Sequence, residues 1–230
     1  MNETIKFYPS EKTALYPSTD LYFIERSRQD GEADLERLVD AVEQEGCWLF
    51  TPNTSRWYNI STGQWDEYGN KNMLIKKRAS IAIPIVSQMG GIATLYHTHP
   101  RNLYYQAQKA FTNGTDNAPK VIPEDYMKCQ EIQTSFPSSG DMSGFMNFLR
   151  LNQDSHIDFR LVSPQGSMQI KFYDGYNPEQ VLYQYTLSNN VGKVVDNALK
   201  YQETRDAISK MIERINYGLD GKCEFSMKFR

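Results

Sequence analysis

Two of the three histidines in this chain lie one residue apart, in Leu95-Tyr96-His97-Thr98-His99-Pro100, at the end of an apolar run. Residues i and i+2 of a strand point to the same face of a sheet, so a strand here brings both imidazoles to one place. Downstream, Pro137-Ser138-Ser139-Gly140-Asp141 stands where apolar residues begin to recur at helical spacing. The fold must therefore bring a strand end and a helix start together if these side chains are to share one ion.

The residue types at these positions suit a metal ion. Zinc binds imidazole nitrogen and carboxylate oxygen, and a catalytic zinc site uses three protein ligands and leaves a fourth position for water. His97, His99 and Asp141 make such a set. Each also has an ordinary explanation, because Ser138-x-x-Asp141 fits a helix capping box, with Ser139 as the alternative cap, and an isolated histidine is usually a surface or core residue. The predicted order of helix, strand, strand and helix around these residues favours the metal site.

The hydrophobic spacing predicts an α/β chain. We expect helices over 33–44 and from residue 138, and a long amphipathic helix over 190–216. Strands are predicted over 21–24, 47–50, 57–60, 73–75, 80–86, 92–97, 159–162, 168–173 and 223–229. The predicted organisation is a single domain over 1–230, with an N-terminal extension 1–32, an insertion 101–137 of mainly irregular sequence that holds one candidate short helix near 104–111, and a C-terminal helical extension 177–230.

Composition excludes several classes of protein. The net charge is −3, and the one basic run, Lys76-Lys77-Arg78, is short, so we expect no nucleic-acid partner. Three widely spaced cysteines give no disulfide framework. The first residues lack an apolar signal core and no stretch approaches the length that spans a membrane, which predicts a soluble protein of a reducing, cytoplasmic compartment without a membrane partner, with export by a non-classical route left open.

The two motifs together resemble those of a known enzyme family. His97-Thr98-His99-Pro100, followed by Ser138-Ser139-Gly140-Asp141, is similar to the H-x-H-P and S-x-x-D motif of the JAMM (MPN-plus) zinc metalloproteases. That family also places a glutamate after a helix, in a Glu-x-Cys-Gly-like context, and Glu45-Gly46-Cys47 resembles it. The resemblance covers about 33–173 without the insertion. It implies His97, His99 and Asp141 as Zn²⁺ ligands, Glu45 as acid/base and Ser138 as oxyanion stabiliser, with Glu43 as the alternative acid/base.

The resemblance also implies a fold and a reaction. The fold is an MPN (cytidine-deaminase-like) α/β domain, with a curved mixed sheet flanked by helices, a long insertion between the metal-ligand segments and a long C-terminal helix. The reaction is zinc-dependent hydrolysis of ubiquitin or ubiquitin-like protein conjugates, in which Glu45 activates a zinc-bound water. A sulfur-carrier protein tail or a cell-wall peptide is the alternative substrate, and a non-catalytic MPN scaffold is the alternative function. The insertion, tied to the site at both ends, is expected to gate or select the substrate.

Two further residues could carry chemistry. His156 lies in a polar stretch after the predicted helix, and we interpret it as a solvent-exposed histidine. Cys47 could act as the nucleophile of a thiol hydrolase, but its neighbours are apolar strand residues that would not lower the pKa of its thiol. Buried packing is the favoured interpretation of Cys47.

Overall fold

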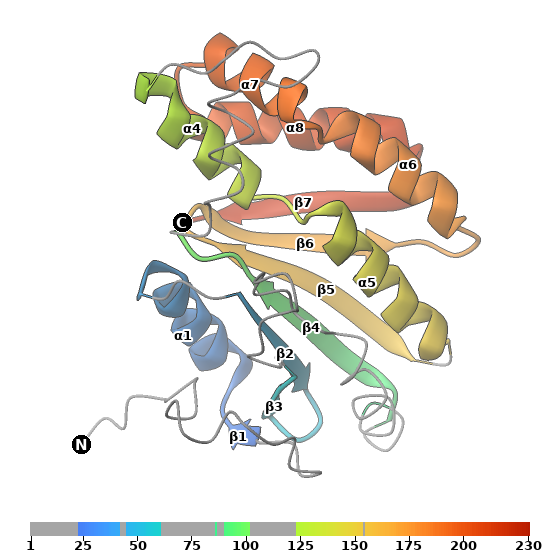
Figure 1. The fold of residues 1–230 in the computed structure, drawn as a ribbon. Helices are drawn as coiled ribbons and strands as arrows, with labels where there is room; N and C mark the ends of the chain where they lie inside the picture. Colours follow the sequence, from blue (N-terminus) through green and yellow to red (C-terminus); the bar gives the residue numbers. More distant parts are fainter. Residues whose placement is uncertain (1–22, 42–44, 61–85, 87–89, 102–122, 154) are drawn as a thin grey trace, which may run out of the picture.

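The structure is a computed structural model that describes residues 23–41, 45–60, 86, 90–101, 123–153 and 155–230. Its centre is a seven-stranded sheet with the strand order β1-β3-β2-β4-β5-β6-β7 (Figure 1). The strands are β1 Phe23–Glu25, β2 Gly46–Thr51, β3 Arg56–Asn59, β4 Ile92–Thr98, β5 His156–Ser163, β6 Gly166–Phe172 and β7 Cys223–Phe229. Only the β4–β5 pair among these is parallel, so the sheet is mixed, as expected.

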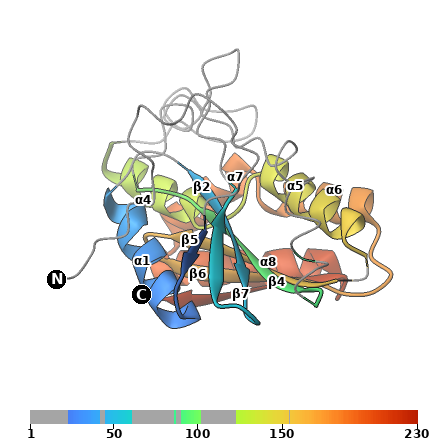
Figure 2. The ribbon, with the colours of Figure 1, turned by 90° about the horizontal axis from the view of Figure 1, so that it is seen from below.

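Helices flank this sheet on both faces. They are α1 Arg28–Ala41, α4 Pro123–Thr134, α5 Ser139–Leu151, α6 Pro178–Ser188, α7 Val191–Lys200 and α8 Thr204–Leu219. Leu35 and Val39 of α1 pack against Trp48 and Tyr96 on one face, and α4 to α8 contribute to the larger core on the opposite face. Figure 2 shows the strands between α1 and α5. None of the described helices combines the length and apolar character needed to span a membrane.

Strand alternation decides which residues of β4 face the larger core. Ala93 and Leu95 belong to that core, and Tyr96 belongs to the core beneath α1. His97 therefore points to the same side as Leu95, and its ring lies 6.2 Å from the Phe145 ring of α5. This alternation places the first histidine between the sheet and α5.

The parallel pairing of β4 and β5 explains why the ends of two distant segments meet. A parallel connection must bring the chain back to the start of the next strand, and here α5 makes that return. With 13 residues, α5 is about 20 Å long, close to the length of a seven-residue β4. Because α5 runs back along the sheet, its N-terminus lies near the C-terminal end of β4.

Most of the predicted elements agree with the structure. β2, β3, β4, β5, β6 and β7 match the predicted strands, and β1 overlaps the strand expected at 21–24. The helix from residue 138 is α5, while α1 begins earlier than expected, at Arg28. The strand expected at 73–75 and the short helix near 104–111 lie outside the described residues. So does the strand at 80–86 except for Val86, which is buried and helical rather than extended.

The prediction of one long C-terminal helix over 190–216 is wrong. The chain ends α7 at Lys200, and Tyr201 is extended, with φ −106° and ψ 133°. Continuing the buried stripe of α7 beyond Ala198 by helical spacing would bring Gln202 and Arg205 into the core. Breaking the helix leaves those side chains in solvent and lets α8 turn its own apolar stripe inward.

One other segment is more regular than expected. Most of the described part of the insertion forms the helix α4, Pro123–Thr134, whose Cys129 and Ile132 enter the larger core. In α4 polar residues interrupt the apolar positions, so the sequence shows no clear helical spacing there. The C-terminal segment 177–230 contains α6, α7 and α8 and ends in β7, the strand expected at 223–229, which pairs with β6 along its whole length.

Gly31 permits the close contact between α1 and the sheet. A Cβ at this position would lie 2.3 Å from two atoms of the Trp57 ring. That ring is fully buried between Phe50 and Tyr96, with centroids 4.7 and 4.8 Å away, and cannot move aside. We expect Gly31→Ala to lower the free energy of unfolding by about 1–3 kcal/mol, although alanine favours helices by about 1 kcal/mol over glycine.

Urea unfolding followed by circular dichroism measures this change. Gly140→Ala in α5 is the control, because a Cβ there meets only the Ser138 hydroxyl, at an ordinary 3.4 Å. The control should be as stable as the wild type or slightly more stable. Equal stability of Gly31→Ala and wild type would contradict the predicted contact.

Candidate metal centre

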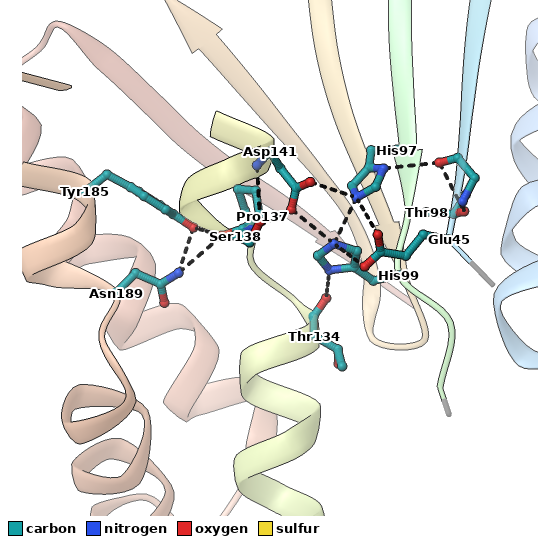
Figure 3. A network of polar contacts seen from close by, with 11 residues as sticks. Glu45, His97, Thr98, His99, Thr134, Pro137, Ser138, Asp141, Tyr185 and Asn189 are labelled. Carbon is teal, nitrogen blue, oxygen red and sulfur yellow. Dashed lines mark hydrogen bonds and ion pairs between the residues drawn. The ribbon is translucent and has the colours of Figure 1, made fainter. Parts of the chain in front are cut away.

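The two histidines at the end of β4 meet at their Nε2 atoms. His97 and His99 are 0% and 1% exposed, and their Nε2 atoms are 3.0 Å apart (Figure 3). The His99 N–H donates to the Val162 carbonyl at 2.9 Å, which extends the β4–β5 ladder past Thr98. The extended backbone through Thr98 therefore keeps both imidazoles on the same face, as the His-x-His spacing predicts.

Backbone carbonyls fix the protonation of both rings. His97 Nδ1 lies 3.1 Å from the Gly46 carbonyl oxygen, and His99 Nδ1 lies 2.9 Å from that of Thr134. A carbonyl oxygen only accepts, so each Nδ1 carries the hydrogen and donates it. In the neutral rings both Nε2 atoms then present lone pairs toward each other. Such a pair requires a positive charge between or beside the two nitrogens, either a proton or a metal ion.

Two carboxylates face the same nitrogen atoms. Asp141 Oδ1 lies 3.3 Å from His97 Nε2, and its Oδ2 lies 3.5 Å from His99 Nε2. Glu45, just before β2, is farther away, with its oxygens 3.9 and 3.8 Å from the same two atoms. Single ligand atoms of Glu45, His97 and His99 all lie within 4.8 Å of one another. Imidazole nitrogens and carboxylate oxygens thus converge in an arrangement compatible with a metal ion.

The charges in this cluster support one another. Burial alone would raise the pKa of Asp141, but the imidazoles of His97 and His99 hold that pKa well below its ordinary value. Burial alone would lower the pKa of His99, but the carboxylates of Asp141 and Glu45 raise it. The carboxylate of Asp141 is therefore ionised and available to a cation.

Ser138 fixes the position of Asp141. The Asp141 N–H donates to Ser138 Oγ at 3.1 Å, and the Ser138 N–H donates to Asp141 Oδ2 at 2.7 Å. This is a complete capping box, so Ser138 is the N-cap and the alternative with Ser139 as cap is wrong. The cap uses the serine oxygen only as an acceptor. The hydroxyl hydrogen of the exposed Ser138 side chain can therefore donate to another acceptor.

The structure describes every candidate site residue predicted from the sequence except Glu43. His97, His99, Asp141 and Glu45 come together, and Ser138 lies beside Asp141 (Figure 3). Glu43, the alternative acid/base, lies outside the described residues. His156 is exposed at the start of β5, as expected. The sequence motifs do not reveal the carbonyls of Gly46 and Thr134, because a backbone acceptor carries no residue-type signature.

The cysteines are unsuited to nucleophilic catalysis. All three are buried, and none forms a disulfide. Burial, with a smaller contribution from the Asp141 charge, raises the pKa of the Cys47 thiol far above its ordinary value. Burial also raises the pKa of Cys129 to about 11 and that of Cys223 to about 12. The thiolate form of each is scarce at neutral pH, as the interpretation of Cys47 as a packing residue requires.

These thiols should be unreactive in the folded protein. With 5,5′-dithiobis(2-nitrobenzoate) at pH 8 we expect less than about 0.1 thiol per chain to react within minutes, since burial and raised pKa values both suppress attack. In guanidinium chloride all three cysteines should react. Rapid modification of Cys47 in the native protein would contradict its placement.

Comparison of the chain with protein-family models, with curated proteins and with solved structures finds no match. A function must therefore be inferred from the motifs and from the geometry of the site. The most informative part of that geometry is the meeting of two imidazoles and two carboxylates at the end of β4.

Proposed function

We propose that this chain is a zinc-dependent isopeptidase or peptidase of the JAMM (MPN-plus) type that hydrolyses conjugates of ubiquitin or a ubiquitin-like protein. One observation carries the proposal: the Nε2 atoms of His97 and His99 are 3.0 Å apart and face the carboxylates of Asp141 and Glu45. The mixed sheet with helices on both faces is compatible with the MPN domain that the motif implies. The substrate class comes from the family resemblance alone.

The distances between donor atoms fit zinc. Two ligands bound at about 2.0–2.1 Å in tetrahedral geometry lie roughly 3.3 Å apart. The separation of 3.0 Å between the imidazoles and the separations of 3.3 and 3.5 Å to Asp141 are close to that value. Glu45 lies beyond it, at 3.8 and 3.9 Å. We therefore assign His97, His99 and Asp141 as ligands, which leaves the fourth position open, and Glu45 as the acid/base.

Each remaining side chain then has a chemical role. Zinc, when bound, supplies Lewis-acid chemistry by lowering the pKa of a water molecule to about 7 and by polarising a carbonyl group. Glu45 takes a proton from the attacking water and later gives it to the leaving amine. Ser138 donates its hydroxyl hydrogen to the developing oxyanion, an interaction that contributes up to about 3–4 kcal/mol in other hydrolases.

Metal content and a cleavage assay test the proposal together. Elemental analysis of the purified chain should find one zinc per molecule, and that protein should cleave ubiquitin chains. Treatment with 1,10-phenanthroline should stop cleavage, and added Zn²⁺ should restore it. Absence of zinc would contradict the proposed enzyme and favour a scaffold. Zinc without ubiquitin cleavage would overturn the substrate class and favour a sulfur-carrier tail or a cell-wall peptide.

A further inference from the structure

A buried hydroxyl from α6 reaches the segment that leads into the metal centre. Tyr185 is 1% exposed, and its hydroxyl donates to the Pro137 carbonyl at 2.5 Å (Figure 3). Pro137 directly precedes the N-cap Ser138. The contact joins two segments that the sequence separates by 48 positions. Tyr185 itself lies outside the segments that carry the sequence motifs.

Neighbouring residues of α6 strengthen this attachment. Asn189, the C-cap of α6, donates from Nδ2 to the Tyr185 hydroxyl at 2.7 Å and lies 3.5 Å from the Pro137 carbonyl. Thr186 directly follows Tyr185 in α6, and its Oγ1 lies 3.0 Å from Ser139 Oγ. Polar contacts from α6 therefore hold the residues on both sides of Ser138.

The attachment continues to the candidate ligand by hydrogen bonds. Ser138 exchanges two hydrogen bonds with Asp141, through its N–H and its Oγ. Asp141 in turn faces both imidazoles, at 3.3 and 3.5 Å. A shift of the Pro137 carbonyl would move Ser138, and with it the capping box that orients the Asp141 carboxylate.

Packing alone does not explain a tyrosine at position 185. Its ring stacks on Phe225 of β7, with centroids 5.3 Å apart and an interplanar angle of 10°, and a phenylalanine would stack equally well. Burying a hydroxyl is unfavourable unless it forms hydrogen bonds. The hydroxyl of Tyr185 is bonded to Pro137 and Asn189, so holding this segment is the contribution that a phenylalanine could not make.

We propose that Tyr185 is a positioning residue of the metal centre: its hydroxyl, supported by Asn189, fixes the Pro137 carbonyl and thereby sets where Asp141 meets the two imidazoles. The role in metal binding rests on the proposed function, whereas the placement of Asp141 does not. The helix α6 is then a functional part of the site and not an appendage to it.

Tyr185→Phe tests the proposal, with Tyr183→Phe as the matched control. Tyr183 lies on the same helix but is 62% exposed. Hydrogen exchange of the metal-free protein reports on the capping box through the amides of Ser138 and Asp141. We expect Tyr185→Phe to speed their exchange about tenfold, the effect of one lost hydrogen bond. Exchange at Met211 in α8 should not change, which separates local loosening from general destabilisation.

Binding of Co²⁺ provides the second measurement. Tyr185→Phe should bind Co²⁺ about 10–100-fold more weakly than the wild type, as is typical when the groups that orient metal ligands are removed. Its visible Co²⁺ spectrum at saturation should also change, because the Asp141 oxygen is differently placed. Tyr183→Phe should match the wild type in affinity and spectrum. If Tyr185→Phe proves too unstable, Asn189→Ala should show smaller changes in the same direction.

The two measurements separate the two proposals. If Tyr185→Phe shows faster exchange but the wild-type protein binds no Co²⁺, the placement of Asp141 by Tyr185 is upheld and the metal function is overturned. Wild-type exchange at Ser138 and Asp141 in Tyr185→Phe would overturn the positioning role, whatever the metal affinity. Faster exchange with unchanged Co²⁺ affinity and spectrum would overturn the link between Tyr185 and the metal.

Discussion

Replacement of Glu45 by glutamine should leave zinc bound and reduce kcat for peptide-bond hydrolysis by about 10²–10⁴-fold, the usual contribution of a general acid/base. Glutamine has the size of glutamate but cannot accept a proton at neutral pH. The oxygens of Glu45 lie 3.8 and 3.9 Å from the imidazoles, farther than those of Asp141, so metal affinity should depend less on Glu45. Steady-state kinetics together with elemental analysis measure both effects.

Glu43→Gln is the matched control, since Glu43 is the alternative acid/base in the same short segment. It should retain wild-type kcat. Inactive Glu43→Gln beside active Glu45→Gln would transfer the role to Glu43. Loss of zinc from Glu45→Gln would instead make Glu45 the third ligand, as the mutual separation of Glu45, His97 and His99 within 4.8 Å permits.

Asp141→Asn should remove the metal. The asparagine oxygen can still accept the hydrogen bond from the Ser138 N–H, so the capping box and the fold should persist. The negative charge facing both imidazoles is lost, however. We expect zinc affinity to fall by more than about 100-fold, the upper end of the effect of changing a residue that only supports a ligand. Titration with Zn²⁺ against a competing chelator measures the change.

Asp174 is exposed, so Asp174→Asn serves as the control and should bind zinc like the wild type. Circular dichroism should give the same spectrum for both variants. An Asp141→Asn protein that keeps wild-type zinc affinity would exclude Asp141 from the ligand set. All hydrolysis should stop in Asp141→Asn if the zinc is lost, so its activity should fall at least as far as that of Glu45→Gln.

The sequence predicts the candidate site well because its residues carry local signals. His97 and His99 follow strand periodicity, and Ser138 and Asp141 begin a helix with a recognisable cap. The parallel pairing of β4 with β5 then brings these two chain segments together. Local pattern and topology agree here, so the predicted convergence is found among the described residues.

The parts that sequence reasoning missed depend on contacts between distant residues. The break at Tyr201 follows from the separate packing of α7 and α8. The amphipathic pattern alone predicts one continuous helix across this position. The sequence gives no sign of the bond from Tyr185 to Pro137, because a tyrosine four residues after Val181 on an amphipathic helix is an ordinary core residue. The helix α4 has only a weak apolar stripe, since Gln130 and Thr134 share its buried side.

The carbonyl partners of the histidines have a consequence for how this protein can vary. Both Nδ1 atoms donate to main-chain oxygens, at residues 46 and 134, and not to side chains. Exchanging the side chain at residue 134 therefore cannot by itself delete the acceptor, provided that the local backbone path is kept. The backbone therefore sets the tautomer of each imidazole. Orthologues can carry another residue at position 134 and still keep the hydrogen on Nδ1 of both rings.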